Sequence, residues 1–282
     1  MPPTLYLIDG HALAYRMYFA LSGGGGVFST SKGEPTAGTF GFAMALLRLL
    51  EKEKPEYLAI AFDTGKTFRD QLYSEYKATR AKMPDDLRLQ IKRIRQMVDA
   101  FGFPRLELEG YEADDVLGSI ATQAAEQDFG VKIITGDKDL LQLVNERIIV
   151  NLPGKKVSEV RDFTPQKVFD YLGIRPDQVV DYKAMAGDSS DNIPGVAGVG
   201  IKTATSLLQQ YGTLDEIYAH IDELPTRARN RLAVDRESAY LSKDLATIRT
   251  NVKITLDIEK ARTSNMDIAA AEDFFKELEF NT

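Results

Sequence analysis

The chain has 282 residues, and its 42 acidic residues outnumber 35 basic ones to give a net charge of −7. It contains no cysteine and two histidines, which excludes disulfides, thiolate metal sites, a cysteine nucleophile and a histidine-rich zinc site. Any metal must therefore be held by oxygen ligands, which favours Mg²⁺ or Mn²⁺. No apolar run approaches the roughly 20 residues that cross a membrane, and the N-terminus lacks a signal-peptide pattern, so we expect no membrane partner.

Charge is unevenly distributed along the chain. A net negative charge taken alone argues against a nucleic-acid partner, because proteins that neutralise phosphates usually carry excess positive charge. Residues 66–95, however, hold nine basic and four acidic side chains, a local charge of +5. This stretch is either a solvated amphipathic helix or a surface that meets phosphates.

Three short apolar runs, TLYLID, YLAIAFD and VKIITGD, end at Asp9, Asp63 and Asp137. Such runs predict strands buried on both faces, and helical patterns at 36–53 and 112–126 lie between them. The alternation predicts an α/β fold with a mostly parallel central sheet flanked by helices. Ligands of such sheets bind at the carboxyl ends of the strands, so three aspartates at that edge are the first functional signal.

The second half of the chain is mainly helical after residue 163. We expect helices near 165–172, 176–186, 202–211, 213–220 and 236–248. The run VKITLDI, residues 252–258, is expected to return as an edge strand. The predicted division is an α/β domain over 1–170, a smaller helical domain over 171–262 and a closing helix or linker over 263–282.

Six further acidic residues form three tight groups, which are Glu112, Asp114 and Asp115, then Asp139 beside Asp137, and then Asp188 with Asp191. Each group alone has a structural explanation, because acids favour helix N-termini and aspartate favours turns. Together the nine carboxylates repel one another unless cations lie between them. Two Mg²⁺ ions would offset four of these charges, and such a pair cleaves phosphodiesters by in-line displacement.

Six segments then give a specific resemblance: DGHALAYR, AFDTGKTFR, GYEADDVLG, ITGDKDLLQLV, GDSSDNIPGVAGVGIKTA and LSKDLATIRT. They resemble, in the same order and over nearly the whole chain, the motifs of the 5′-nuclease domain of bacterial DNA polymerase I. More distantly they resemble flap endonucleases. The resemblance implies a PIN-like 5′-nuclease fold with a helical arch near 64–100 and a helix-hairpin-helix domain over 171–262.

The same resemblance implies which acids serve which metal. Asp9, Asp63, Glu112 and Asp114 would serve mainly the first of two Mg²⁺ (or Mn²⁺) ions. Asp137, Asp139, Asp188 and Asp191 would serve mainly the second, with Asp114 or Asp115 near both. The resemblance also implies that Lys77 and Arg80 contact the scissile phosphate, where they would stabilise charge in the transition state.

DNA-binding residues are expected at a hairpin and in the arch. Gly195, Gly198 and Gly200 permit a tight turn, and Lys202 and Thr203 open a helix whose N-terminus can receive a phosphate. Such a hairpin contacts the backbone and so gives no sequence preference. The family often binds a monovalent cation at this hairpin, and the resemblance implies K⁺ here.

Several other residues are weaker candidates. Phe68, Tyr73 and Tyr76 are candidates to stack on unpaired bases. Arg16 is a candidate phosphate contact or a structural ion pair, and His11 is expected to form local hydrogen bonds without a catalytic role. The segment GEPT, residues 33–36, either helps to bind a duplex end or caps a helix. The run Gly23–Gly26 is expected to be a flexible loop.

The function expected from the resemblance is a structure-specific 5′–3′ exonuclease and 5′-flap endonuclease in primer removal and repair. Its partners would be DNA with a 5′ flap or 5′ end, and an RNA primer on DNA. We expect a cytoplasmic, nucleoid-associated bacterial monomer, and a fragment of a chain fused to a polymerase domain.

Three alternatives remain at this point. A PIN-like ribonuclease shares the sheet and the acidic centre but does not predict the hairpin after Asp191. A haloacid-dehalogenase-like phosphatase would explain Asp137-x-Asp139, but that class carries its Asp-x-Asp after the first strand, where this chain has a lone Asp9. A DNA-binding scaffold without catalysis predicts missing carboxylates, and none of the nine is missing.

Overall fold

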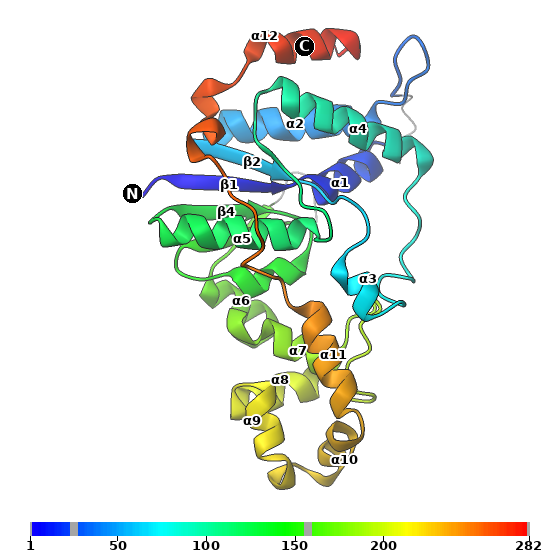
Figure 1. The fold of residues 1–282 in the computed structure, drawn as a ribbon, viewed down its shortest axis with the longest axis vertical. Coiled ribbons are helices and arrows are strands. Elements are labelled where there is room, and N and C mark those ends of the chain that lie inside the picture. Colours follow the sequence, from blue (N-terminus) through cyan, green and yellow to red (C-terminus); the bar gives the residue numbers. More distant parts are fainter. Residues whose placement is uncertain (1, 23–27, 155–159, 281–282) are drawn as a thin grey trace.

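The computed structural model describes residues 2–22, 28–154 and 160–280, so Gly23–Gly26 lie outside the described residues. A six-stranded sheet forms the centre of the upper part (Figure 1). The strands are β1 (Thr4–Asp9), β2 (Tyr57–Ala61), β3 (Arg105–Leu106), β4 (Gly130–Ile134), β5 (Ile148–Pro153) and β6 (Val160–Phe163). Their order is β3-β2-β1-β4-β5-β6, and all neighbours are parallel except β5 and β6. The predicted mostly parallel sheet is confirmed.

Helices cover both faces of this sheet (Figure 1). One face carries α1 (Gly10–Ser22), α2 (Ala37–Lys52) and α4 (Asp85–Ala100), with α12 (Ile268–Glu277) packed outside α4, and the other face carries α5 (Ala113–Glu126). Strand β1 explains why both faces are apolar: Leu5 and Leu7 join the core on the α5 side, and Ile8 joins the core on the α2 side. Among the described residues, no helix is both long and apolar enough to cross a membrane.

The N-terminus of α2 is capped from another helix. Thr36 holds the N-cap position, yet its side chain makes no capping hydrogen bond. Instead Gln90 of α4 accepts from the backbone N–H groups of Gly38 at 2.6 Å and Thr39 at 3.2 Å. Since this bond satisfies two of the free donors of the helix end, it fixes α4 against α2.

The segment between α3 (Phe68–Leu72) and α4 forms turns rather than a continuous helical arch. The short helix α3 begins with a capping box between Thr67 and Asp70. It ends at Leu72, and Lys77 then has a left-handed backbone with φ of +56°. That conformation is rare for a residue with a side chain and interrupts any helix. The expected arch is thus irregular between residues 73 and 84.

The lower part of the molecule is a group of helices (Figure 1). They are α6 (Pro165–Leu172), α7 (Val179–Ala186), α8 (Ile201–Tyr211), α9 (Leu214–Ala219), α10 (Thr226–Val234) and α11 (Arg236–Ala246). Their buried residues, among them Leu208, Ile217 and Leu232, belong to the same apolar cluster as the α5 side of the sheet. The helical part therefore packs continuously onto the sheet part.

The edge strand expected at residues 252–258 is wrong. This segment has no strand pairing and leads into a 3-10 turn over Ile258–Ala261. Its backbone groups bond to side chains of α5 instead: the Val252 N–H donates to Ser119 Oγ, and the Ile254 carbonyl accepts from Gln123 Nε2. Alternating apolar residues here follow a helix surface and not a neighbouring strand.

The hairpin between α7 and α8 depends on two glycines. Gly195 has φ of +66° and Gly198 has φ of +76°, both left-handed. A Cβ at Gly195 would lie 2.4 Å from the backbone nitrogen of Gly187. Gly200 differs from the expectation: it has φ of −97° at the N-cap of α8, with open space around it, so the turn does not require glycine there.

Substitution by alanine should distinguish Gly195, whose backbone is left-handed, from Gly200, whose backbone is not. We expect Gly195→Ala to lower the free energy of unfolding by more than about 2 kcal/mol, because the left-handed backbone and the contact with Gly187 both oppose a side chain. Gly200→Ala should cost less than about 1 kcal/mol, the difference between glycine and alanine at an N-cap. Urea denaturation of both variants measures this, and equal losses would contradict it.

Candidate active site

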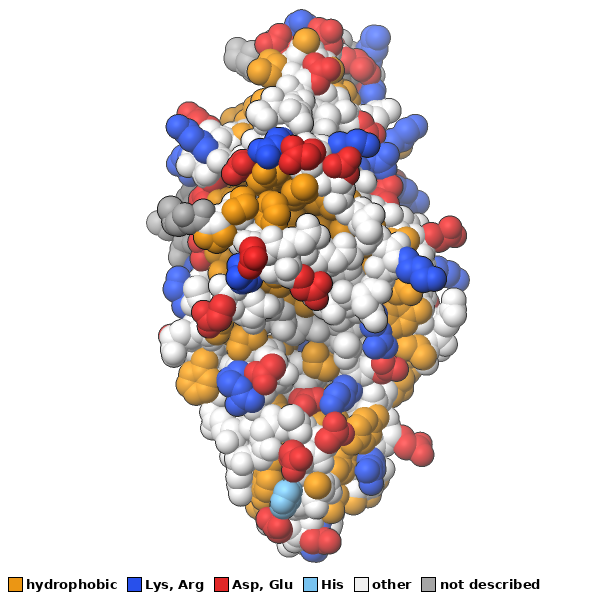
Figure 2. Space-filling view, turned by 60° about the vertical axis from the view of Figure 1, so that its left-hand side comes forward, with side chains coloured by type: hydrophobic (Ala, Val, Ile, Leu, Met, Phe, Trp, Pro, Cys, Tyr) orange, Lys and Arg blue, Asp and Glu red, His pale blue; other side chains and the backbone are white. Residues whose placement is uncertain are grey.

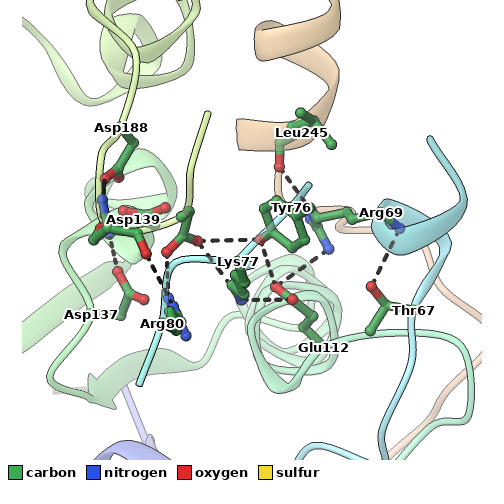
Figure 3. A network of polar contacts seen from close by, with 12 residues as sticks. Thr67, Arg69, Tyr76, Lys77, Arg80, Glu112, Asp137, Asp139, Asp188 and Leu245 are labelled. Carbon is green, nitrogen blue, oxygen red and sulfur yellow. Dashed lines mark hydrogen bonds and ion pairs between the residues drawn. The ribbon is translucent and has the colours of Figure 1, made fainter. Parts of the chain in front are cut away.

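Carboxylates from five segments gather at the carboxyl edge of the sheet. Asp9 ends β1, and Asp63 follows β2. Glu112 and Asp114 begin α5, where Glu112 is the N-cap. Further acids come from the turn after β4 and from the loop after α7: Asp137, Asp139, Asp188 and Asp191. Figure 3 shows several of these side chains facing Lys77 and Arg80.

Hydrogen bonds from the protein hold the acids at the strand ends. Asp9 accepts from the Ala12 N–H at 2.9 Å and from the Thr135 hydroxyl at 2.8 Å. The carboxylate of Asp63 accepts from the N–H of Ala113 at 2.8 Å, and its own N–H donates to His11 Nδ1 at 3.1 Å. Burial lowers the pKa of His11, so its ring is neutral and forms local hydrogen bonds, as expected.

The acids are close enough to destabilise one another's charge. Burial, with the charges of Asp63 and Asp137, raises the pKa of Asp9 to about 7, although the Ala12 N–H and the Thr135 hydroxyl oppose the rise. Burial, with the charges of Asp137 and Asp9, raises the pKa of Asp114 well above its ordinary value. These directions describe a pocket with strong negative potential.

A third carboxyl is affected in the same way. Burial and the charge of Asp137 raise the pKa of Asp139 to about 7, despite the nearby ammonium of Lys183. Asp188 differs, because Lys183 outweighs burial there and lowers its pKa to about 2. The two acids share one lysine, but only Asp188 also accepts from the N–H and the hydroxyl of Ser190, so its charge is the more stable of the two.

Three basic side chains lie among the acids. Lys77 donates to Glu112 Oε1 at 2.6 Å and lies 3.8 Å from Asp191, and Arg80 forms an ion pair with Asp191. Burial works against the charge of Lys77, but Glu112 and Asp191 outweigh it and raise the pKa of the ammonium. Lys77 and Arg80, which the resemblance assigned to catalysis, are thus held against the acidic centre.

The third basic residue, Lys183, was missed by the sequence analysis. It is 9% exposed on α7 and pairs with both Asp139 and Asp188. The available signal was a lysine in a short helix whose next residues, Ala184 and Met185, are apolar. A buried lysine needs a carboxylate partner, and Asp188 lies one turn beyond.

The donor set fits a hard divalent cation, since carboxylate oxygens are the ligands such ions prefer. Within the described residues, no three carboxylates or histidines stand grouped as a finished ion site. Lys77, Arg80 and Lys183 hold several of the acids in ion pairs. The negative potential is therefore balanced in part by the protein's own cations.

The structure separates Asp115 from the other eight acids. Its side chain is 0% exposed and forms a two-bond ion pair with Arg69 at 2.7 and 2.8 Å. The expected place of Asp115 near both metals is corrected accordingly. It points from the first turn of α5 toward α3, whereas Asp114 interacts with Asp137 and Asp9.

The candidate base-stacking residues are placed differently from one another. Tyr76 is 7% exposed, and its hydroxyl lies 3.3 Å from both Glu112 and Asp191. Burial strongly raises its pKa. Since its ring is enclosed, the expected stacking of Tyr76 on a free base is corrected. Tyr73 and Phe68 are half-buried.

The candidate phosphate contacts are spread over the molecule. Lys202 and Thr203 are exposed in the first turn of α8. Arg16 lies half-buried on α1, and Glu34 of the GEPT segment is held by Arg93 at 2.6 Å. On the face in Figure 2, acidic and basic side chains alternate, and the described residues form no broad basic area there. Phosphate binding on that face has little electrostatic support.

Comparisons with known proteins identify the family. Residues 4–173 match the model of the 5′-3′ exonuclease N-terminal resolvase-like domain, and residues 174–269 match that of the 5′-3′ exonuclease C-terminal SAM fold. The chain is 47% identical to DNA polymerase I of Chloroflexus aurantiacus over 281 residues, 99% of this chain and 30% of the relative. It is 41% identical to DNA polymerase I of Bacillus subtilis over 280 residues, 99% of this chain and 31% of that protein.

Solved structures share the fold. The T5 D15 protein co-crystallised with metal ions matches with a TM-score of 0.69 and 21% identity, covering 98% of each chain. The catalytic core of Rad2 in complex with DNA substrate matches with a TM-score of 0.62 and 15% identity, covering 99% of this chain and 88% of that one.

The chain therefore belongs to the 5′-3′ exonuclease family, a family of nucleases. The family resemblance expected from the sequence motifs is confirmed. The chain spans about 30% of the length of the DNA polymerase I relatives that it matches.

The raised pKa values predict how stability depends on pH without divalent metal. Asp9 and Asp139 have a pKa of about 7 in the folded state against 3.8 ordinarily, so between these values the folded chain binds protons that the unfolded chain releases. Their contribution therefore falls as pH rises from about 4 to about 7. Asp188 acts oppositely and only below its ordinary value, since its pKa is lowered.

Thermal melting in chelator at pH 5, 6, 7 and 8 measures this decline. We expect Asp9→Asn to flatten it, because the variant removes one of the titrating groups. Mg²⁺ should also flatten it, because ion binding replaces the bound protons. An Asp9→Asn variant with the same pH slope as the parent chain would contradict the electrostatic interpretation.

Proposed function

We propose that the chain is a structure-specific 5′–3′ exonuclease and 5′-flap endonuclease that hydrolyses DNA phosphodiesters with divalent metal ions. The observation that supports it most is that carboxylates from five segments lie at the carboxyl edge of the sheet, where Lys77 pairs with Glu112 and Arg80 with Asp191, in a chain of the 5′-3′ exonuclease family. Ligand sites of parallel sheets occur at this edge.

Two divalent cations, Mg²⁺ or Mn²⁺, would be held by the carboxylates at this edge. The residues proposed to hold them are Asp9, Asp63, Glu112, Asp114, Asp137, Asp139, Asp188 and Asp191. When bound, such ions make hydroxide available at neutral pH and neutralise charge on a phosphate. Because the protein's own lysines and arginine pair with several of these acids, ion binding requires those pairs to loosen.

Lys77 and Arg80 are proposed to stabilise the scissile phosphate. Both are long cationic side chains at the acidic centre, and Arg80 is partly exposed while Lys77 is mostly covered. A phosphate that enters beside the acids gives them a new partner, and its growing negative charge in the transition state is stabilised by them. The left-handed backbone of Lys77 is the kind of strain found at functional sites.

The hairpin and α8 are proposed to bind the DNA duplex through its backbone. Gly195 and Gly198 shape the turn, and Gly200, Lys202 and Thr203 open α8 at an exposed helix N-terminus. Free N–H groups at such an end suit a phosphate. The same proposal includes three further contacts. K⁺ would bind at the hairpin, Arg16 would contact a phosphate near the first aspartate, and Tyr73 would stack on an unpaired base.

The substrate, the oligomeric state and the domain division of the protein follow from the same proposed activity. The substrate is DNA with a 5′ flap or 5′ end, with an RNA primer on DNA as a related substrate, in replication and repair. Among the similar structures, T5 D15 flap endonuclease is a pseudo-enzyme-product complex with DNA, which supports DNA as the ligand. We propose a cytoplasmic, nucleoid-associated monomer with a nuclease domain over 1–170 and a DNA-binding domain over 171–262, joined to a polymerase domain.

A ribonuclease of the PIN-like class is the second candidate. It shares the sheet and the acids, but the family match extends over residues 174–269, which include the hairpin. A catalytically inactive scaffold is disfavoured, because every carboxylate of the proposed set is present.

Cleavage of a 5′-labelled flap duplex tests the proposed function. We expect Mg²⁺ to give short oligonucleotides and chelator to give none. Asp114→Asn and Asp137→Asn should reduce cutting by at least about 100-fold, because each removes charge that holds an ion. Asp273→Asn, exposed on α12, is the matched control and should cut normally. A parent chain that cuts only RNA, or variants that cut normally, would refute the proposal.

The cationic side chains are tested separately. We expect Lys77→Met to lower kcat about 100-fold, the usual effect of losing one donor to a transition-state anion, with little change in KM. Lys276→Met, a solvent-exposed lysine that pairs with Asp273, is the control. Single-turnover flap cleavage gives the rate, and an unchanged rate for Lys77→Met would remove Lys77 from the proposed mechanism.

A further inference from the structure

Arg69 and Asp115 form an ion pair in the interior of the protein. Arg69, in α3, is 2% exposed, and Asp115, in the first turn of α5, is 0% exposed. The guanidinium donates from both terminal nitrogens, to Oδ2 at 2.7 Å and to Oδ1 at 2.8 Å. This parallel arrangement is the strongest geometry for such a pair.

The other hydrogen-bonding positions of the pair are also filled. Arg69 Nε donates to the Leu245 carbonyl at 2.9 Å (Figure 3). A terminal nitrogen of Arg69 donates to the Thr247 carbonyl at 2.7 Å. Asp115 Oδ1 accepts from the Arg249 N–H at 2.8 Å, and Oδ2 accepts from the Glu112 N–H at 3.1 Å. A carboxylate offers about four lone-pair positions, so Asp115 has none left for a metal ion.

The pair joins three segments that are distant in the sequence. Arg69 lies 46 residues before Asp115 and 176 residues before Leu245. Two buried charges tolerate only the arrangement that satisfies them, because an unpaired buried charge is strongly unfavourable. The pair therefore fixes α3, the start of α5 and the end of α11 relative to one another.

Lys77 and Glu112 are each close in the sequence to one member of the Arg69–Asp115 pair, which we call the junction. Glu112 lies one turn before Asp115 and shares a capping box with it. From α3 the chain passes through two bonded turns, Tyr73 N–H to Arg69 carbonyl and Tyr76 N–H to Tyr73 carbonyl, before it reaches Lys77. A shift of the junction therefore moves Lys77 against Glu112.

The same junction leads to the hairpin. Leu245 and Thr247 end α11, and α11 holds the hairpin glycine by two bonds. The Gly195 N–H donates to Ser242 Oγ at 2.9 Å, and Ser238 Oγ donates to the Gly195 carbonyl at 2.6 Å. The hairpin, which would hold the duplex, and Lys77, which would act on the phosphate, are therefore both positioned by the Arg69–Asp115 pair.

We propose that Arg69 and Asp115 are positioning residues that keep Lys77 aligned with Glu112 and with the hairpin, and that Asp115 is not a metal ligand. This inference rests on the proposed nuclease function. Loss of the pair misplaces Lys77 without removing any group that binds DNA or metal. It therefore lowers the rate of cleavage more than the affinity for DNA.

The conservative variants Arg69→Lys and Asp115→Asn test the proposal. We expect each to lower single-turnover flap cleavage about 10- to 100-fold, as small misplacements of reacting groups do, while the Kd for the flap in Ca²⁺ changes less than about threefold. The double variant should be no slower than either single variant, because both remove one interaction. Arg262→Lys, which removes a two-bond pair with Glu259 at the opposite end of β2, is the matched control.

Three further measurements show how the pair acts on cleavage. Hydrogen exchange should accelerate at residues 73–80 in both variants and remain unchanged in β1. Lys77→Met should cost much less activity in the Asp115→Asn background than in the parent chain. The rise in melting temperature on adding Ca²⁺ should persist in Asp115→Asn and shrink in Asp114→Asn. Of these two residues, only Asp114 is proposed to hold an ion.

The outcomes separate this inference from the function on which it rests. A parent chain that cuts no flap refutes the function. If the parent chain cuts, then additive effects of Arg69→Lys and Asp115→Asn, or a lost Ca²⁺ response in Asp115→Asn, would overturn the positioning role. Failure of both conservative variants to fold would also overturn it, because the pair would then belong to the core of the whole molecule.

Discussion

Repulsion between carboxylates gathered at one edge of a parallel sheet is the constraint on which the site depends. The parallel strands bring Asp9, Asp63 and Asp137 to the same edge, and burial makes the charge of Asp9 costly enough to raise its pKa to about 7. Such a pocket is stable only if cations or protons offset the charge. The fold thus creates a place whose simplest ligand is a hard cation, and whose chemistry follows from that ligand.

The same constraint explains the basic side chains at this edge. Lys77 and Lys183 are largely buried, and each pairs with acids of the site, so each offsets part of the negative charge there. The irregular segment between α3 and α4 brings Lys77 to the acids, and the Arg69–Asp115 pair holds the base of that segment. The Arg69–Asp115 pair, which holds the fold, therefore lies next to the Lys77–Glu112 pair of the site but is separate from it.

Sequence reasoning predicted the sheet and the acids because each depends on a local pattern. An apolar run that ends in aspartate fixes both a strand and the edge to which its acid belongs, as at Asp9 and Asp63. It could not separate Asp115 from Asp114, since helix geometry turns neighbouring side chains about 100° apart but does not tell which of them meets Arg69 of α3. Lys183 was missed for a related reason, because its partner Asp139 is 44 residues away. The failed strand at 252–258 shows that an apolar alternation does not reveal which surface it meets.

The central claim is that the eight acids act together on bound divalent ions. Counting the Mn²⁺ ions bound per chain, by paramagnetic resonance titration in the presence of a flap duplex, tests it most directly. We expect two ions per chain in the parent protein and fewer in Asp114→Asn, with no change in Asp115→Asn. A parent chain that binds no Mn²⁺, or an Asp114→Asn variant that binds as many ions as the parent, would contradict the claim.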